Sequence, residues 1–177
     1  MPIPLGARAD RLTRVRALRT VKGRREHEQF AFEGPTLLAE AHRSGTRIDE
    51  LYVTADAYAA TPLVRELEAG GTPTYEIAGA SAAKLSDVDT PTGIVAVSAV
   101  RLAAAGALPP DADGLVLVLG DLSDPANAGA LLRSADAFGA SAVLFGRLGV
   151  DPYHPKVVRG AMGALFRLPL GLAEPAE

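Results

Sequence analysis

The sequence contains no cysteine, and only three histidines occur among its 177 residues. The lack of cysteine excludes disulfide bonds and thiolate chemistry, and it is compatible with a reducing compartment. Three scattered histidines without cysteine do not match the ligand pattern of a zinc site. The sequence therefore predicts no metal centre.

Long apolar runs are also missing. No run approaches the roughly 20 residues of a membrane-spanning helix, and no basic leader followed by an apolar segment marks a signal peptide. Hydrophobic residues make up 48% and charged residues 22% of the chain, which is typical of a soluble globular protein. We therefore expect a cytoplasmic protein with no membrane partner, built as one large domain or two small ones.

The net charge of −3 conceals an uneven distribution. Residues 1–25 carry eight arginines or lysines and a single acidic residue, so the remainder of the chain is acidic. A basic segment on an acidic body favours a polyanionic partner such as nucleic acid. The alternative is a solvated amphipathic helix in which Leu12, Val15 and Leu18 pack inward. The candidate phosphate contacts, taken as a group, are Arg16, Arg19, Lys22, Arg24 and Arg25.

The first hundred residues alternate between strand and helix patterns, which predicts a small α/β domain over 1–100. Strands are predicted at 30–32, 51–53, 74–77 and 93–100, and helices at 7–22, 35–45, 62–69 and 81–85. A charged turn is predicted at 23–29. Residues 101–114 are rich in alanine, glycine and proline and show little periodicity, so they are predicted to be an inter-domain linker.

The second predicted domain, 115–177, begins with a strand–loop–helix–strand stretch at 115–145. The unbroken apolar run 115–119 predicts a parallel strand that is buried on both faces. Asn127 stands where the helix should begin, as a preferred N-cap. A second strand at 141–145 would complete a βαβ crossover. Ligands bind beyond the carboxyl ends of such strands, which places the loop before Asn127 at the functional edge and Arg133 two turns into the helix. A helix at 156–164, a strand at 166–170 and a polar tail follow.

Two segments of this second domain carry a family resemblance. DPANAGALLRSADAFGA (124–140) and DPYHPKVVRGAMGALFRLPL (151–170) resemble the SpoU/TrmH family of RNA ribose 2′-O-methyltransferases, part of the SPOUT class. The first contains the Asn-x-Gly-x-x-x-Arg core of that family's first motif. In the amino-terminal half, FAFEGPTLLAEAHRSG (30–45), with DELYVT (49–54) and DVDTPTGIVAV (87–97), is similar to the family's substrate-binding domain.

The resemblance implies an α/β fold, with a small amino-terminal substrate-binding domain followed by a parallel α/β SPOUT domain. It also implies methyl transfer from S-adenosylmethionine to a ribose 2′-hydroxyl of RNA, with rRNA ahead of tRNA, in a family that is usually homodimeric.

Asn127 and Arg133 match the first-motif residues, and the family assigns this arginine to the target ribose or its phosphate. Placing a weak hydroxyl nucleophile in line with the methyl group accelerates transfer, and a fixed cation stabilises developing alkoxide charge. A guanidinium also binds phosphate bidentately. The alternative for Arg133 is a surface ion pair with Asp136, and the alternative for Asn127 is a plain N-cap.

The family's second and third motifs, a Gly-rich loop with an acidic residue and a Ser-Leu-Asn segment, have no counterpart in the sequence. In the family they form the knotted cofactor pocket and most of the dimer interface. We therefore expect a partial SPOUT domain without the knot-forming segment, unknown cofactor-binding residues and weak binding of S-adenosylmethionine. Such a domain would leave a sheet edge and part of a sheet face uncovered.

Two further positions have an open role. Glu33-Gly34 is interpreted as a mainly structural strand-to-helix turn, and His154 as a loop histidine that is either a general base or chemically inert. The leading hypothesis is an RNA 2′-O-methyltransferase that is incomplete as written, and the alternative is a non-catalytic RNA-binding remnant of one, marked by salt-sensitive RNA binding without cofactor binding. An unrelated nucleotide-binding α/β protein ranks last, because no phosphate-cradling glycine pattern follows Leu119 or Phe145.

Overall fold

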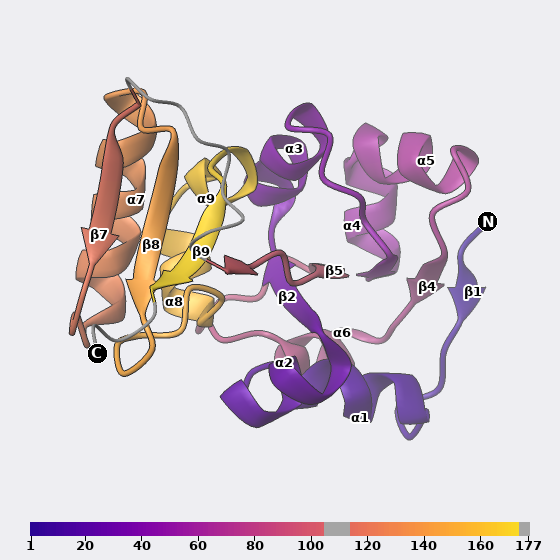
Figure 1. Ribbon diagram of the computed structural model, residues 1–177. Helices are drawn as coiled ribbons and strands as arrows, with labels where there is room; N and C mark the ends of the chain where they lie inside the picture. The colour runs from indigo at the N-terminus through magenta and orange to yellow at the C-terminus, as the bar shows by residue number, and fades with distance from the viewer. Residues whose placement is uncertain (105–113, 174–177) are drawn as a thin grey trace. The chain divides into compact units, whose positions relative to one another are not determined.

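The computed structural model describes residues 1–104 and 114–173, and the chain divides into two compact units, Met1–Val100 and Arg101–Glu177 (Figure 1). The amino-terminal unit is built on a five-stranded mixed sheet and the carboxyl-terminal unit on a four-stranded parallel sheet. Helices accompany both sheets, so the predicted α/β class is confirmed.

The sheet of the amino-terminal unit has the strand order β1–β4–β3–β5–β2. Its strands are β1 (Ile3–Pro4), β2 (Gln29–Glu33), β3 (Glu50–Val53), β4 (Thr74–Glu76) and β5 (Ile94–Ala99). Strands β1, β4 and β3 run parallel, whereas β5 pairs antiparallel with both β3 and β2. The carboxyl ends of the three parallel strands therefore share one edge of the sheet.

Two helix layers cover the faces of this sheet (Figure 1). One contains α1 (Asp10–Ala17), α2 (Val21–His27) and α6 (Gly79–Leu85), and the other contains α3 (Pro35–Arg43), α4 (Ala55–Ala60) and α5 (Pro62–Ala69). Leu12, Val15 and Leu18 pack inward against a core that includes Tyr52 and Tyr75. The apolar spacing that marked an amphipathic helix is thus confirmed, because these residues recur every three positions on one helix face.

The predicted single helix over 7–22 and the charged turn over 23–29 are both wrong. The chain forms two helices instead, and Thr20 is the N-cap of the second one, with its hydroxyl accepting a hydrogen bond from the Gly23 amide at 3.1 Å. Glu28, with a φ of 52°, ends α2 in the left-handed region. The break does not interrupt the run of basic residues, which is why composition alone extended the first helix.

The strand-to-helix turn after β2 has the predicted form. Gly34 has a φ of 98°, a conformation that residues with a Cβ rarely adopt. Pro35 occupies the first turn of α3, where its missing N–H costs no hydrogen bond. The turn is closed by a hydrogen bond from the Gly34 amide to the carbonyl of Ile94 at 3.1 Å.

The carboxyl-terminal unit has the strand order β6–β9–β8–β7, with every neighbouring pair parallel. Its elements are β6 (Ala103–Ala104), β7 (Val116–Leu119), α7 (Pro125–Ala137), β8 (Ala142–Gly146), α8 (Pro155–Gly160), α9 (Ala164–Arg167) and β9 (Leu170–Ala173). The predicted strand–helix–strand unit is therefore present as β7–α7–β8.

Strand β7 differs from its prediction, because it is not buried on both faces. Val116 and Val118 are 45% and 57% exposed, whereas Leu119 is buried. Within the described residues β7 is the edge strand of the sheet, with β8 as its neighbour. The expectation of an open sheet edge with part of a face uncovered thus holds for the described residues, and the exposed face explains why an unbroken apolar run overestimated burial.

The last elements also begin and end elsewhere than predicted. The expected helix 156–164 is interrupted after Gly160, because Met162 and Gly163 have φ values of 49° and 93°. A second short helix then occupies the beginning of the strand predicted at 166–170, which starts only at Leu170 and includes the first three residues of the expected tail. The predicted linker contributes strand β6, and its residues 105–113 lie outside the described part of the chain.

Candidate functional site

The carboxyl edge of the parallel sheet begins where β7 ends at Leu119. The helix that follows is capped by Asp124, whose Oδ1 accepts a hydrogen bond from the Asn127 amide at 2.8 Å. Pro125 occupies the first turn of α7. The prediction of Asn127 as the N-cap is therefore wrong, since Asn127 lies three residues inside the helix. The Asp-Pro pair was the usable sequence signal, because Asp favours the cap and Pro the first helical position.

Two loops meet at this edge without leaving space between their backbones. A Cβ added to Gly146 would lie 2.2 Å from the carbonyl oxygen of Gly120, and one added to Gly149 would lie 2.9 Å from the same oxygen. The Val150 amide donates a hydrogen bond to the Leu122 carbonyl at 2.7 Å. The described residues of this edge therefore do not form a cofactor pocket by themselves, and no cofactor contact is assigned to them.

Arg133 projects from α7 into solvent. Its predicted alternative partner, Asp136, is bound by Arg167 instead, with Nη2 to Oδ2 at 2.7 Å and Nε to Oδ2 at 3.1 Å. The interpretation of Arg133 as half of a surface ion pair is therefore wrong. Among the described residues the Arg133 side chain has no hydrogen-bond or ion-pair partner, so its guanidinium is available to a ligand.

Asn127 and Arg133 both have exposed side chains, but the structure does not make them one cluster. Six residues along an α-helix correspond to about 9 Å of rise and about 240° of rotation. A ligand that touches both side chains must therefore extend along and around α7, as a nucleotide chain can.

His154 has a structural role. Its Nδ1 accepts a hydrogen bond from the Lys156 amide at 3.2 Å and thereby caps α8, and Pro155 follows at the first helical position. Helices α7 and α8 thus start with the same cap–proline arrangement. Because Nδ1 already serves as an acceptor, it is not free to take a proton from a substrate.

The basic residues of the amino-terminal unit fall into two groups. Arg24 is 3% exposed and donates a hydrogen bond to the Leu18 carbonyl at 2.8 Å, so the prediction that it contacts phosphate is wrong. The other predicted contacts are exposed, namely Arg16, Arg19, Lys22 and Arg25.

Two further arginines of this segment hold the fold together. Arg11 Nη1 donates to Glu50 Oε1 at 2.6 Å, and Arg14 forms an ion pair with the same carboxylate. The Arg11 guanidinium also lies 4.8 Å from the centroid of the Tyr75 ring. Burial and a hydrogen bond to Glu50 raise the pKa of the Tyr52 hydroxyl. This network joins α1 to β3 and β4, and it uses two cations that composition alone would have assigned to a partner.

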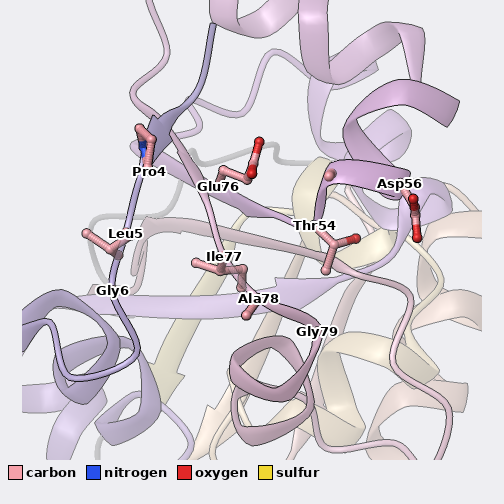
Figure 2. A pocket seen from close by; sticks show the side chains of 10 residues that line it. Pro4, Leu5, Gly6, Thr54, Asp56, Glu76, Ile77, Ala78 and Gly79 are labelled. Atoms are coloured by element: carbon pink, nitrogen blue, oxygen red, sulfur yellow. The ribbon is translucent and has the colours of Figure 1, made fainter.

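A cavity of about 610 Å³ lies at the carboxyl ends of β1, β3 and β4 (Figure 2). Asp56 and Glu76 supply carboxylates to its lining, and Leu5 and Ile77 supply apolar surface. No basic residue lines it, so it does not suit a phosphate group. None of the site residues predicted from the sequence belongs to its lining.

Glu33 is a second acidic feature of this unit. Its Oε1 is buried and accepts no hydrogen bond among the described residues. Burial raises the pKa of Glu33, and the neighbouring Asp87 carboxyl adds to the rise, although a hydrogen bond from Ser86 opposes it. The folded state therefore favours the protonated carboxyl.

We expect the replacement Glu33→Gln to stabilise the protein at neutral pH and to leave it nearly unchanged in acid. The reason is that the raised pKa makes native stability fully present below the ordinary pKa of glutamate and reduces it as the pH rises through the folded-state value. Urea midpoints of both proteins between pH 3.5 and 8 measure this difference. A gap that is the same at every pH would contradict the assignment to ionisation.

Two classes of site are not found in the described part of the chain. Its His, Asp and Glu side chains form no group of three or more that could hold a metal ion. None of the helices between residues 1–104 and 114–173 is long and apolar enough to cross a membrane.

Comparison with known families matches both units of the chain. The SpoU rRNA Methylase family matches residues 114–176, and the MRM3-like substrate binding domain matches residues 10–96. The chain belongs to the SpoU methylase family. The two matches cover the segments that carried the resemblance to SpoU/TrmH proteins, and that expectation is confirmed.

Relatives of this SpoU-family chain are found in bacteria and in mitochondria. It is 33% identical to an uncharacterised tRNA/rRNA methyltransferase of Synechocystis, over 88% of the chain and 56% of that protein. It is 30% identical to the 23S rRNA (guanosine(2553)-2′-O)-methyltransferase RlmP of Bacillus subtilis, over 86% of the chain and 58% of that protein. The chain thus spans little more than half the length of these relatives.

Solved structures of related methyltransferases share the fold. An AdoMet-bound rRNA methyltransferase from Sinorhizobium meliloti superimposes with a TM-score of 0.85 at 25% identity, over 97% of the SpoU-family chain and 65% of the solved chain. The AdoMet complex of AviRb from Streptomyces viridochromogenes gives a TM-score of 0.81 at 26% identity, over 96% and 64%. A SPOUT-type α/β fold is therefore shown for both units.

Proposed function

We propose that the protein takes part in the 2′-O-methylation of RNA ribose, with S-adenosylmethionine as methyl donor and rRNA, ahead of tRNA, as substrate. Family membership supports methyl transfer to RNA, and the printed function of the Bacillus subtilis relative supports the ribose 2′-oxygen of rRNA. The AdoMet complexes of two structural relatives support the donor. The observation in this chain that carries the proposal is the exposed, unpartnered Arg133 on the helix that leaves the carboxyl edge of the sheet.

In this proposal Arg133 binds the target nucleotide and holds its 2′-oxygen for reaction. A guanidinium keeps its charge and grips a phosphate or ribose oxygen through two N–H groups. The same charge stabilises the alkoxide character that grows on the 2′-oxygen as it loses its proton. S-adenosylmethionine, when bound, supplies the methyl group on a sulfonium centre. No described residue is assigned as the proton acceptor.

The remaining predicted residues are proposed to hold the RNA outside the reacting nucleotide. Asn127 lies in the first turn of the same helix and presents an exposed amide. Arg16, Arg19, Lys22 and Arg25 are proposed as phosphate contacts of the amino-terminal unit, without Arg24. We further propose that the protein works as a homodimer in the cytoplasm, as the family resemblance and the absence of cysteine favour.

The test is a methylation assay with the intact protein purified from its own cells. Tritiated S-adenosylmethionine is offered with rRNA or tRNA from a strain that lacks the gene, and labelled positions are mapped by resistance of 2′-O-methylated linkages to alkaline hydrolysis. We expect label in a single rRNA nucleotide. Label in tRNA alone would overturn the rRNA assignment, and label on a base would overturn the ribose assignment.

A non-catalytic RNA-binding protein is the second candidate. The observation that favours it is the close contact of the two loops at the carboxyl edge, where the described residues leave no cofactor pocket. Salt-sensitive RNA binding by the intact protein, together with no saturable calorimetric binding of S-adenosylmethionine, would select this candidate.

A further inference from the structure

The two helix layers of the amino-terminal unit carry opposite charge. Helices α1, α2 and α6 contain seven arginines or lysines and two acidic residues. Helices α3, α4 and α5 contain two arginines and four acidic residues. Because the two layers cover opposite faces of one sheet (Figure 1), the unit has a cationic side and an acidic side.

The cations of the two layers also differ in how they are used. On the acidic side, Arg43 pairs with Glu40 at 2.7 Å, and Arg65 donates to the Tyr58 and Ala59 carbonyls at 2.7 Å each. On the cationic side, the side chains of Arg16, Lys22, Arg25 and Lys84 make no hydrogen bond or ion pair with any described residue. Uncompensated positive charge is therefore concentrated on one side.

Lys84 joins this surface from a distant part of the sequence. Helices α1 and α6 share one hydrophobic core, and Arg19 Nη1 lies 3.5 Å from the Lys84 carbonyl oxygen. The ends of the two helices are thus adjacent, and the Lys84 side chain is exposed beside the basic segment. We call Arg16, Arg19, Lys22, Arg25 and Lys84 the cationic surface.

We propose that the cationic surface binds the phosphate backbone of the RNA substrate and that Lys84 is one of its contacts. This inference rests on the proposed function only in taking RNA as the substrate. Cations that lack carboxylate partners gain most from a polyanion, because no internal ion pair must first be broken. Helices α1, α2 and α6 contain no aromatic residue on which a base could stack, so contact with phosphate, independent of base sequence, is the mode that fits.

The test compares two double variants of the intact protein that remove the same charge. Arg16→Gln with Lys84→Gln alters the cationic surface, and Arg43→Gln with Arg65→Gln alters the acidic side. Dissociation constants for a labelled rRNA fragment are measured by fluorescence anisotropy between 50 and 200 mM KCl. The slope of log affinity against log salt concentration should fall by roughly 1.5 in the first variant, at about 0.7–0.9 per lost phosphate contact. The slope should stay unchanged in the second.

Several results would overturn the proposal. One is an equal change in slope in both double variants, because net charge rather than place would then explain binding. Others are an unchanged slope in the first variant, no RNA binding by the unaltered protein at 50 mM KCl, or equally tight binding of polyglutamate. The outcome is separable from catalysis, since RNA binding that depends on this surface without any methyl transfer would uphold the proposal and refute the enzyme.

Discussion

Replacing Arg133 by alanine is expected to lower the rate of RNA methylation by about 100- to 1,000-fold, the usual effect of removing one fixed donor that faces developing charge. The thermal midpoint should not change, because the exposed Arg133 side chain has no partner among the described residues. Initial rates with labelled S-adenosylmethionine, measured at saturating and limiting RNA, give the loss in kcat and in kcat/KM separately. A loss in kcat distinguishes a role in the transition state from a role in RNA binding alone.

Three variants control this experiment. Arg133→Lys keeps the charge but loses the two-pronged guanidinium, so we expect it to recover only part of the rate. Ser134→Ala changes a neighbouring exposed residue whose hydroxyl bonds only to the Ala130 carbonyl, and it should remain active. Arg167→Gln breaks the pair with Asp136 and should cost less than about 1 kcal/mol of stability, as exposed pairs do. Activity of Arg133→Ala within threefold of the unaltered protein would contradict the assignment.

The order of strands and helices could be predicted from local patterns, whereas their interruptions could not. The break before α2 depends on Thr20 capping a new helix, and a threonine inside a basic run is a weak signal. The break after α8 depends on Met162 adopting a φ of 49°, a conformation for which a methionine gives no sequence signal. Strand β7 was expected to be buried because an apolar run records hydrophobicity but not whether neighbours cover both faces.

The site could be predicted only as far as single residues allow. Arg24 and Arg25 are adjacent in the sequence, and only the hydrogen bond to the Leu18 carbonyl shows that Arg24 is internal. The availability of Arg133 depends on Asp136 being bound by Arg167, which lies 31 residues further along the chain. Tertiary contacts of this kind decide which members of a charged group are free, so composition identifies the group but not its working members.

The replacement Gly146→Ala is expected to destabilise the carboxyl-terminal unit by about 3 kcal/mol or more, the upper range for forcing an extra carbon into packed structure. The added Cβ would lie 2.2 Å from the Gly120 carbonyl oxygen, and neither group is a flexible side chain that could move away. Gly120→Ala is the matched control, because a Cβ there meets no atom within 4 Å. Both changes restrict the unfolded chain equally, so their difference in urea midpoint reports the native contact alone.

The consequence of Gly146→Ala should extend to the site. Strands β7 and β8 pair from Val116–Ala142 to Leu119–Phe145, and the loop after each strand begins at one of the two clashing glycines. Separating these loops would shift the segment before α7, where the Asp124 cap and Pro125 fix the start of the helix that carries Arg133. Amide exchange should therefore accelerate in β7, β8 and the first turn of α7 while the amino-terminal unit keeps its protection. Unchanged exchange in α7 would show that the start of the helix is held independently of the glycine contact.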